Sequence, residues 1–326
     1  MFSKTRVAVL RGGPSSEYEV SLKTGASVLA HLPESYHPLD VFVDRKGSWH
    51  LLGKMEPIEK ILGKVDIVWN ALHGEYGEDG AIQTILETHG IPFSGSRRLA
   101  AALSFNKSLA KKIVERSGIK TPHSRVLKQE DYTSGEALAQ ELYRAFPQPS
   151  IIKPVGRGSS IGVSFAETPE EIWTALSVAF SVSETILIEE YIEGKEASLG
   201  VIEGFRGEPY YALMPVQVAV APDKKFFDQQ TKYSGAALHQ CPGNFSNSEK
   251  SELAKLAIAI HRLLDLRHYS RSEFIVHPKR GIFFLETDAL PDLHEGISPY
   301  LQSLQSAGAT FSEFLEHVLT LARSGK

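Results

Sequence analysis

The segment "IIKPVGRGSSIGVS", residues 151–164, is the feature that most constrains the fold. An apolar run ends at Lys153, a glycine-rich turn follows, and a second extended run begins, which predicts a β-hairpin with an ammonium group at its mouth. Gly156, Gly158 and Gly162 permit a tight turn whose backbone N–H groups approach a phosphate closely. A Walker loop and a dinucleotide-binding fold both lead from a strand into a helix, so the hairpin argues against them. An ordinary hairpin with no ligand has the same pattern.

Strands alternate with helices in the first part of the chain. Apolar runs at residues 5–10, 38–44 and 65–74 predict strands, and Ser15 or Ser16 with Glu19 predicts a capping box that opens a helix between the first two. This alternation predicts a parallel sheet with a site at the strand ends. We therefore expect an α/β (α+β) protein with three units, residues 1–104, 105–188 and 189–326.

The two later blocks mix helices with antiparallel strands. Amphipathic patterns predict helices at residues 105–118, about 168–180, about 248–266 and 311–324. The segment "ILIEEYIEG", residues 186–194, predicts a strand end that could bind a purine and a ribose. The binding groups would be the backbone of Glu189, Glu190, Tyr191 and Ile192 and the carboxylates of the two glutamates. On its own it is equally an ordinary strand end.

Carboxylates gather at the ends of two further predicted strands. Glu286 and Asp288 are two residues apart and share one side of an extended chain, as do Arg271 and Glu273 on the preceding strand. Three carboxylates in one cleft are costly unless a cation compensates them. Mg²⁺ held together with nucleotide phosphates is the natural candidate. The alternative is a solvated acidic strand edge.

Composition narrows the class of protein. The net charge of −4 gives no basic field for nucleic acid or a membrane surface. The single cysteine, Cys241, excludes an internal disulfide, and no histidine-bearing motif surrounds it as a nucleophile would require. The N-terminal residues lack an apolar signal segment, and no apolar run approaches the ~18 residues of a membrane span. We expect a cytoplasmic protein that acts on small molecules.

Six segments in this order resemble the D-alanine–D-alanine ligase family of the ATP-grasp superfamily. The likeness extends over nearly the whole chain, and it is the order and spacing that make it specific. The segments are "VAVLRGGPSSEYEVSLKTGASVL", "ALHGEYGEDGAIQTILETHGIPFSGS", "IIKPVGRGSSIGVS", "LIEEYIEGKE", "TKYSG" and "FFLETD".

The resemblance implies a three-domain ATP-grasp fold, with an N-terminal parallel α/β domain followed by two domains that clamp ATP. It implies that ATP phosphorylates the carboxylate of one D-alanine, that a second D-alanine attacks the acyl phosphate, and that the dipeptide serves peptidoglycan synthesis. Two Mg²⁺ (or Mn²⁺) ions would accompany ATP, and the protein would be a homodimer. The loop 221–245 would be a lid that excludes water.

The resemblance also assigns roles to residues. The phosphate-facing lysines would be Lys107, Lys153 and Lys232, the adenosine-binding carboxylates Glu189 and Glu196, and the metal ligands Glu273, Glu286 and Asp288. Glu17, with Ser159 and Tyr233, would hold the ammonium group of the first substrate. His73 would lie near the acyl phosphate, and Arg271 would stabilise the tetrahedral oxyanion.

Four positions depart from the family pattern. Glu273 and Asp288 stand where the family has aspartate and asparagine. Asp292 replaces a glycine near the oxyanion, and Ile297 replaces the serine that binds the carboxylate of the second substrate, with Ser298 one residue further on as a substitute. Three alternatives follow: a D-alanine–D-alanine ligase with a repaired second site, a related ligase that uses a different amine acceptor attracted by Asp292, His294 and Glu295, and an ATP-binding homologue that has lost ligation. A nicotinamide oxidoreductase is disfavoured because "RGGPSSE" lacks the G-x-G-x-x-G spacing.

Overall fold

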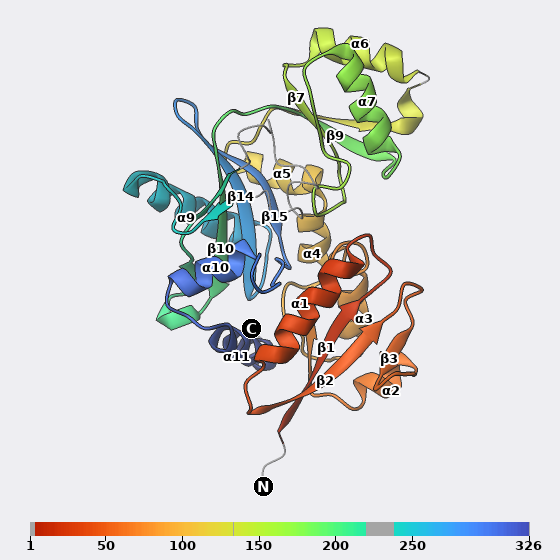
Figure 1. The fold of residues 1–326 in the computed structure, drawn as a ribbon, viewed down its shortest axis with the longest axis vertical. Coiled ribbons are helices and arrows are strands. Elements are labelled where there is room, and N and C mark those ends of the chain that lie inside the picture. The colour runs from red at the N-terminus through yellow and green to blue at the C-terminus, as the bar shows by residue number, and fades with distance from the viewer. Residues whose placement is uncertain (1–3, 133, 220–237, 326) are drawn as a thin grey trace.

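The fold is built on three β-sheets that lie along the long axis of the molecule (Figure 1). The computed structural model describes residues 4–132, 134–219 and 238–325, and the three sheets are those of these residues. Lys232, Tyr233 and most of the expected lid lie outside the described residues.

The N-terminal sheet has a parallel centre and an antiparallel edge. Its strands lie in the order β4 (Lys54–Met55), β3 (Trp49–Leu51), β2 (Tyr36–Val43), β1 (Thr5–Gly12) and β5 (Ile67–Asn70). β1 is parallel to β2 and β5, which confirms the predicted parallel strands. β3 and β4 pair antiparallel and were not predicted, because strands of three and two residues carry no measurable alternation. The helices of this part are α1 (Tyr18–His31), α2 (Ile58–Leu62) and α3 (Ala81–Thr88).

The capping box predicted for the first helix is wrong. α1 begins at Tyr18 with Glu17 as its N-cap residue, and no side chain caps it. The hydroxyl groups of Ser15 and Ser16 donate instead to Glu75 at 3.1 Å. The Glu17 side chain is thereby left to face the cleft described below.

The central sheet is antiparallel and contains the predicted hairpin. Its strands lie in the order β6 (Ser124–Lys128), β9 (Thr185–Glu190), β7 (Ser150–Pro154) and β8 (Ser164–Ala166). β7 and β8 pair antiparallel, so the glycine-rich segment is a hairpin turn as the sequence predicts. α6 (Gly135–Ala145) and α7 (Pro169–Phe180) pack together on it, while η1 (Gln129–Asp131) follows β6.

The C-terminal sheet carries the two predicted acidic strands side by side. Its order is β13 (Leu238–Gln240), β12 (Val216–Ala219), β10 (Lys195–Glu203), β14 (Tyr269–His277) and β15 (Gly281–Asp288), with β11 (Tyr210–Ala212) paired to β10. The remaining elements are α4 (Arg98–Phe105), α5 (Lys107–Arg116), η2 (Phe205–Gly207), α9 (Asn247–Leu263), α10 (Pro299–Ser306) and α11 (Phe311–Ser324). α5 packs on this sheet through Ala110 and Val114, although it precedes the central sheet in sequence. The three domain boundaries stay a prediction.

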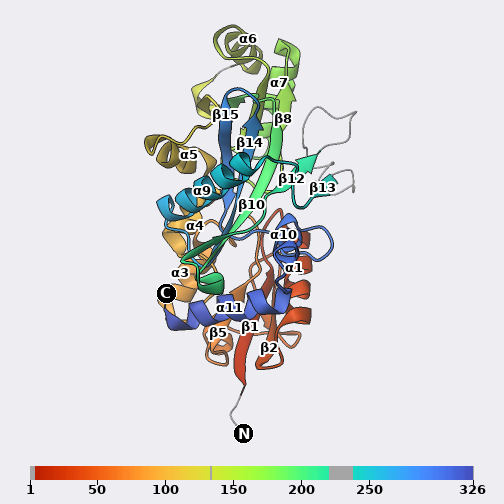
Figure 2. The ribbon, with the colours of Figure 1, turned by 90° about the vertical axis from the view of Figure 1, so that its left-hand side faces the viewer.

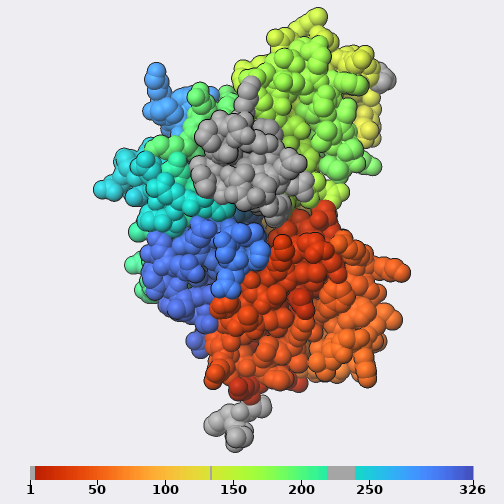
Figure 3. All heavy atoms as spheres, viewed as in Figure 1, coloured from red at the N-terminus to blue at the C-terminus, as the bar shows by residue number. Residues whose placement is uncertain are grey.

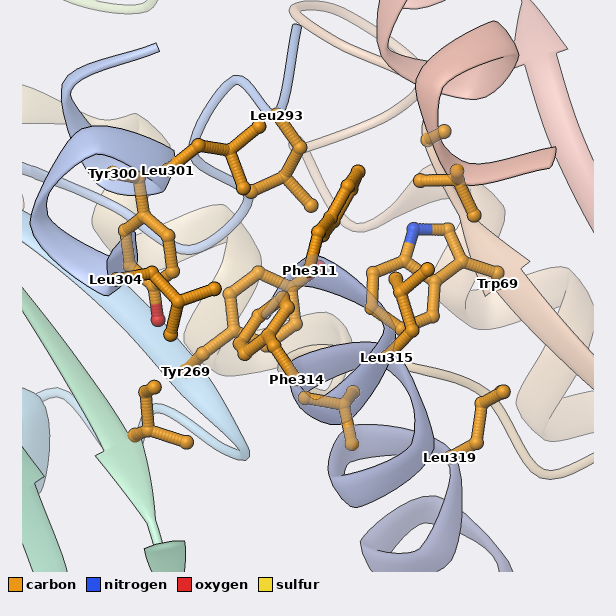
Figure 4. Packing of buried hydrophobic residues seen from close by; sticks show 14 of the residues in the cluster. Trp69, Tyr269, Leu293, Tyr300, Leu301, Leu304, Phe311, Phe314, Leu315 and Leu319 are labelled. Carbon is orange, nitrogen blue, oxygen red and sulfur yellow. The ribbon is translucent and has the colours of Figure 1, made fainter. Parts of the chain in front are cut away.

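One hydrophobic core joins the N-terminal sheet to the C-terminal part. α11 crosses beside β5 and β1 (Figure 2), and its Phe314 is fully buried. The Phe314 ring lies 6.1 Å from Trp69, 5.2 Å from Tyr269 and 5.5 Å from Tyr300, measured between ring centroids (Figure 4). The red and blue ends of the chain accordingly meet over a broad surface (Figure 3). Among the described residues, no helix is both long and apolar enough to cross a membrane.

Phe314→Ala tests whether this core holds the two parts together. Removing the buried ring should lower the free energy of unfolding by about 3–5 kcal/mol, whereas Leu99→Ala, at a side chain 68% exposed, should change it by less than about 0.5 kcal/mol. Urea unfolding followed by circular dichroism measures both. Equal effects of the two substitutions would contradict the role of Phe314.

Candidate active site

Nine of the residues singled out in the sequence line one cleft between the central sheet and the strands β14 and β15. We call this cleft, of about 140 Å³, pocket A. The nine residues are Lys107, Lys153, Glu189, Glu190, Tyr191, Ile192, Glu196, Glu273 and Glu286. Apolar side chains complete its walls: Pro122, Ile151, Ile161, Val163, Ile275 and Leu285. A pocket with apolar walls and a few charged groups is typical of a nucleotide site.

Glu189 is held by two lysines at the floor of pocket A. Its carboxylate is an ion-pair partner of Lys153 at 2.8 Å and of Lys111, and all three side chains are buried. Burial raises the pKa of Glu189, but the two ammonium groups outweigh it and hold that pKa below its ordinary value. Burial lowers the pKa of Lys111 to about 8 against the opposing effect of Glu189. Lys153 is therefore oriented by Glu189 before any ligand arrives.

Glu190 uses its carboxylate on the opposite side of the strand. Successive side chains of β9 point to opposite faces, and Arg280 donates to Glu190 at 2.9 and 3.1 Å. The His123 N–H donates to the same carboxylate at 3.0 Å. The Glu190 side chain is thus engaged away from Glu189, and its backbone N–H donates to the His123 carbonyl at 2.9 Å.

The three predicted metal ligands lie on one face of neighbouring strands. Glu273 is directly opposite Glu286, and Asp288 is directly opposite Arg271. Each carboxylate has a cationic neighbour: Lys107 lies 3.0 Å from Glu286, and Arg271 contacts Asp288 and lies 3.0 Å from Glu273. No group of three or more His, Cys, Asp or Glu side chains is gathered for a metal within residues 4–132, 134–219 and 238–325.

The donor chemistry nevertheless fits a hard cation. All three groups supply carboxylate oxygens, and like charges directly opposite each other on a sheet repel unless a cation lies between them. Burial lowers the pKa of Arg271, but Asp288 and Glu273 outweigh it and raise that pKa above its ordinary value. In this structure Arg271 and Lys107 balance the negative charge of the three carboxylates, which a divalent ion could also neutralise.

A second cavity, pocket B, adjoins pocket A and shares Lys107, Arg157 and Glu286 with it. Its other charged and polar walls are Glu17, His73, Glu78, Ser104, Ser159, Arg271, Thr287, Asp288 and Asp292. Residues from the ends of β1, β5 and β15 and from the hairpin turn therefore meet in one place, as predicted.

The hairpin turn closes directly onto Glu17. Ser159 donates its hydroxyl hydrogen to the Glu17 carboxylate, and Ser159 takes a positive φ of 50° to do so. A side chain at Gly158 would overlap the Glu17 carboxylate, so only glycine permits this approach. The third member of the predicted set, Tyr233, lies outside the described residues.

His73 and Asp292, both on the wall of pocket B, are linked through the hydroxyl group of Thr24. His73 Nε2 lies 3.0 Å from Thr24 Oγ1, which donates to Asp292 Oδ1 at 2.9 Å. On its other side, His73 Nδ1 lies 3.6 Å from Glu78, and both side chains are buried. Burial raises the pKa of Glu78 to about 7, and burial of His73 is outweighed by Glu78, Asp292 and Glu17, which raise the pKa of the imidazole.

Sequence reasoning missed Glu78 and Arg157, which line these pockets, and Lys111 and Thr24, which contact residues of the pocket walls. Glu78 belongs to the segment "ALHGEYGEDG" that pointed to His73, and its spacing of five residues gave no signal of contact. Lys111 is a buried lysine one helical turn after Lys107, a pattern that could have been found. Thr24 and Arg157 carry no pattern of their own, because their roles depend on tertiary contacts.

The prediction that Ser298 takes the role of the serine missing at residue 297 is wrong. Ser298 is 1% exposed, its hydroxyl donates to the Asp292 carbonyl at 2.5 Å, and it accepts from Leu301 N at 3.2 Å as the N-cap of α10. Both capacities of the hydroxyl are used inside the turn. Ile297 is 41% exposed and offers no hydrogen-bond donor from its side chain.

Comparison with known proteins gives one consistent match. Residues 6–60 and 52–96 match the family described as D-ala D-ala ligase N-terminus, and residues 113–320 match D-ala D-ala ligase C-terminus. The chain is 33% identical to the D-alanine–D-alanine ligase of Geobacter sulfurreducens, over 98% of this chain and 94% of that protein. It is 34% identical to the enzyme of the same name from Geotalea uraniireducens, over 97% and 95%.

Solved structures of related ligases share the architecture. The VanG D-Ala:D-Ser ligase from Enterococcus faecalis superimposes with a TM-score of 0.83 at 26% identity, covering 98% of this chain and 100% of that chain. D-alanyl-alanine synthetase A from Vibrio cholerae gives a TM-score of 0.83 at 26% identity, covering 99% of each chain.

The buried pair of Glu78 and His73 predicts a pH dependence of stability. A carboxyl group whose pKa rises from 4.5 to about 7 on folding binds more protons in the folded state, so stability falls as pH rises through this window. The raised pKa of His73 acts in the same direction. Between about pH 4.5 and 7, this linkage lowers the free energy of unfolding by up to about 3 kcal/mol. Glu78→Gln should remove that contribution, so the Tm of the variant should fall less over the same pH range. An unchanged pH profile would contradict the assignment, and Glu130→Gln, at an exposed carboxylate, is the control.

Proposed function

The chain belongs to the D-alanine–D-alanine ligase family, and we propose that it joins two molecules of D-alanine into D-alanyl-D-alanine at the expense of ATP. It has the ATP-grasp fold and the ATP-dependent ligase character of that family. The single observation that carries the proposal is the junction of pockets A and B. Their shared wall of Lys107, Arg157 and Glu286 lets a nucleotide in one pocket meet a carboxylate substrate in the other.

Pocket A is the proposed ATP site. Lys153, positioned by Glu189, and Lys107, which reaches the Arg157 carbonyl at 2.6 Å, present two ammonium groups to the phosphates. Glu189, the backbone of Glu190 to Ile192 and the Glu196 side chain would bind the adenosine. Lys232 would be a further phosphate-binding lysine. Transfer of a phosphoryl group needs this positioning and charge neutralisation more than covalent help.

Glu273, Glu286 and Asp288 are the proposed ligands of Mg²⁺ or Mn²⁺, with two ions as the expected number. When bound, the ions would neutralise the negative charge that develops on the phosphates. For this to happen the carboxylates must exchange their ion pairs with Lys107 and Arg271. The side chains of Lys107 and Arg271 would then be free to contact the anionic substrates.

Pocket B is the proposed site of the first D-alanine. The ammonium group of this D-alanine would be held by Glu17, which Ser159 orients, with Tyr233 as a further hydrogen-bonding partner. The carboxylate of the same D-alanine would lie toward Lys107 and the nucleotide. Attack of the carboxylate oxygen on the γ-phosphorus would expel ADP and leave an acyl phosphate. Arg271 would then stabilise the tetrahedral oxyanion that forms when the amine of the second D-alanine attacks the acyl carbon, before phosphate leaves. His73, held by Glu78 and Thr24, would lie beside the acyl phosphate. The lid 221–245 would exclude water.

The setting of the reaction is also proposed. The dipeptide would supply peptidoglycan synthesis in the cytoplasm, and the chain would act as a homodimer.

A different amine acceptor is the second candidate function. Ile297 lacks a donor for an acceptor carboxylate, and Ser298 is used inside its turn. The carboxylate of a second D-alanine would therefore find no side-chain donor at residues 297–298. Leaving it unpaired would cost about 1–3 kcal/mol of binding free energy.

Product analysis separates these functions. The protein, Mg²⁺, ATP and D-alanine should release ADP and D-alanyl-D-alanine in equal amounts, measured by a coupled assay and by mass spectrometry. ADP without dipeptide would favour another acceptor, which a panel of amines would then identify. Bound ATP without ADP release would contradict ligase activity.

Substitutions in the hairpin turn test the role of Glu17. Gly158→Ala should raise the KM of the first D-alanine by at least about tenfold, because the methyl group displaces the Glu17 carboxylate and a charged hydrogen bond is lost. Gly156→Ala is the matched control, since its added carbon lies 3.6 Å from the Phe105 ring in ordinary contact. Similar kinetics for both variants would remove Glu17 from substrate binding.

A further inference from the structure

A third cavity opens from the turn that follows β15. This cavity, pocket C, has a volume of about 260 Å³. Its walls are Ser16, Glu17, Glu19, Val20, Lys23, Ser159, Ile161, Asp292, His294 and Ile297. Glu17, Val20, Ser159 and Asp292 also line pocket B, so the two cavities meet at these side chains. Pocket C is therefore a second approach to the cavity of the proposed reaction centre.

Besides Glu17, which is the proposed partner of the first substrate, Asp292 is a second carboxylate at this boundary. Its Oδ1 atom accepts hydrogen bonds from Thr24 Oγ1 at 2.9 Å and from His294 N at 2.7 Å. In the part of the chain that the structure describes, no hydrogen bond reaches its Oδ2 atom. Glu17 likewise accepts a hydrogen bond through one oxygen, Oε1, from Ser159. One oxygen of Asp292 is thus fixed and the other is free for a ligand.

The support behind Asp292 is rigid. Thr24 is 2% exposed and is itself contacted by His73, which Glu78 holds from the other side. The hydroxyl hydrogen of Thr24 is directed at Asp292, so the threonine oxygen accepts from His73. The chain of contacts from Glu78 through His73 to Thr24 therefore fixes the orientation of the Asp292 carboxylate.

We propose that Asp292 binds the ammonium group of the acceptor amino acid and so holds this substrate beside the reaction centre, with Thr24 as the positioning residue. This inference rests on the proposed ligase function and adds a specificity determinant to it. The acceptor is selected as an amine by a charged hydrogen bond to Oδ2, and not by a side-chain hydroxyl at residues 297–298. No bond is made or broken by Asp292 in this role.

Asp292→Asn is the direct test, because asparagine retains an acceptor oxygen for Thr24 and His294 while removing the charge. The KM of the acceptor D-alanine should rise by about tenfold or more, the range for loss of a charged hydrogen bond, while the KM values of ATP and of the first D-alanine stay within about twofold. Glu295→Gln is the matched control: this carboxylate lies in the same turn but faces His31 at 3.6 Å. It should leave all three KM values unchanged.

Thr24→Val supplies a second, independent variant. It keeps the volume of the side chain but removes the hydroxyl, so it should raise the acceptor KM less than Asp292→Asn does, and Thr24→Ser should restore it. A purely structural role of Asp292 within its turn predicts a normal acceptor KM for Asp292→Asn, because the turn hydrogen bonds persist. That result, or a rise confined to the KM of the first D-alanine, would overturn the inference. Failure of the unmodified protein to form dipeptide would instead count against the proposed function.

Discussion

The aromatic core around Phe314 is the contact on which the rest of the site depends. It fixes the N-terminal sheet against the C-terminal sheet, since Trp69 belongs to β5 and Tyr269 to β14. With those strands fixed, the chain beyond β5 delivers His73 and the chain beyond β15 delivers Asp292 to the same cavity. His73 and Asp292 lie in connecting segments, but their separation is set by the packed side chains of this core.

Charge balance is the second constraint. The charged walls of pockets A and B are Glu17, Glu78, Glu189, Glu190, Glu196, Glu273, Glu286, Asp288 and Asp292 together with Lys107, Lys153, Arg157 and Arg271. Lys111 adds a further cation through its ion pair with Glu189. Buried charges are tolerated only in pairs, and the pairs seen here link residues that are far apart in sequence, such as Lys107 with Glu286. A polyphosphate with its cations brings both signs of charge, so it can replace these ion pairs without leaving a group uncompensated. The resting structure is therefore electrostatically prepared for the ligand.

The sequence predicted those features that depend on local pattern. The hairpin of residues 151–164, the acidic faces of β14 and β15 and the lining of pocket A by Lys153 and Glu189 all follow from periodicity and from the family resemblance. It did not predict the capping of α1 or the use of Ser298, because each hydroxyl has several possible partners and tertiary contacts decide among them. Thr24 reaches Asp292 across 268 residues, a distance in sequence over which no local pattern carries information.

The central claim is that pockets A and B together activate a carboxylate as an acyl phosphate. The most direct measurement uses D-alanine labelled with ¹⁸O in its carboxylate, with mass spectrometry of the phosphate released by the unmodified protein in the presence of Mg²⁺ and ATP. Attack of the carboxylate oxygen on the γ-phosphorus transfers that oxygen, so one ¹⁸O atom should appear in phosphate for each dipeptide formed. Label found in AMP, or phosphate without label, would contradict the account.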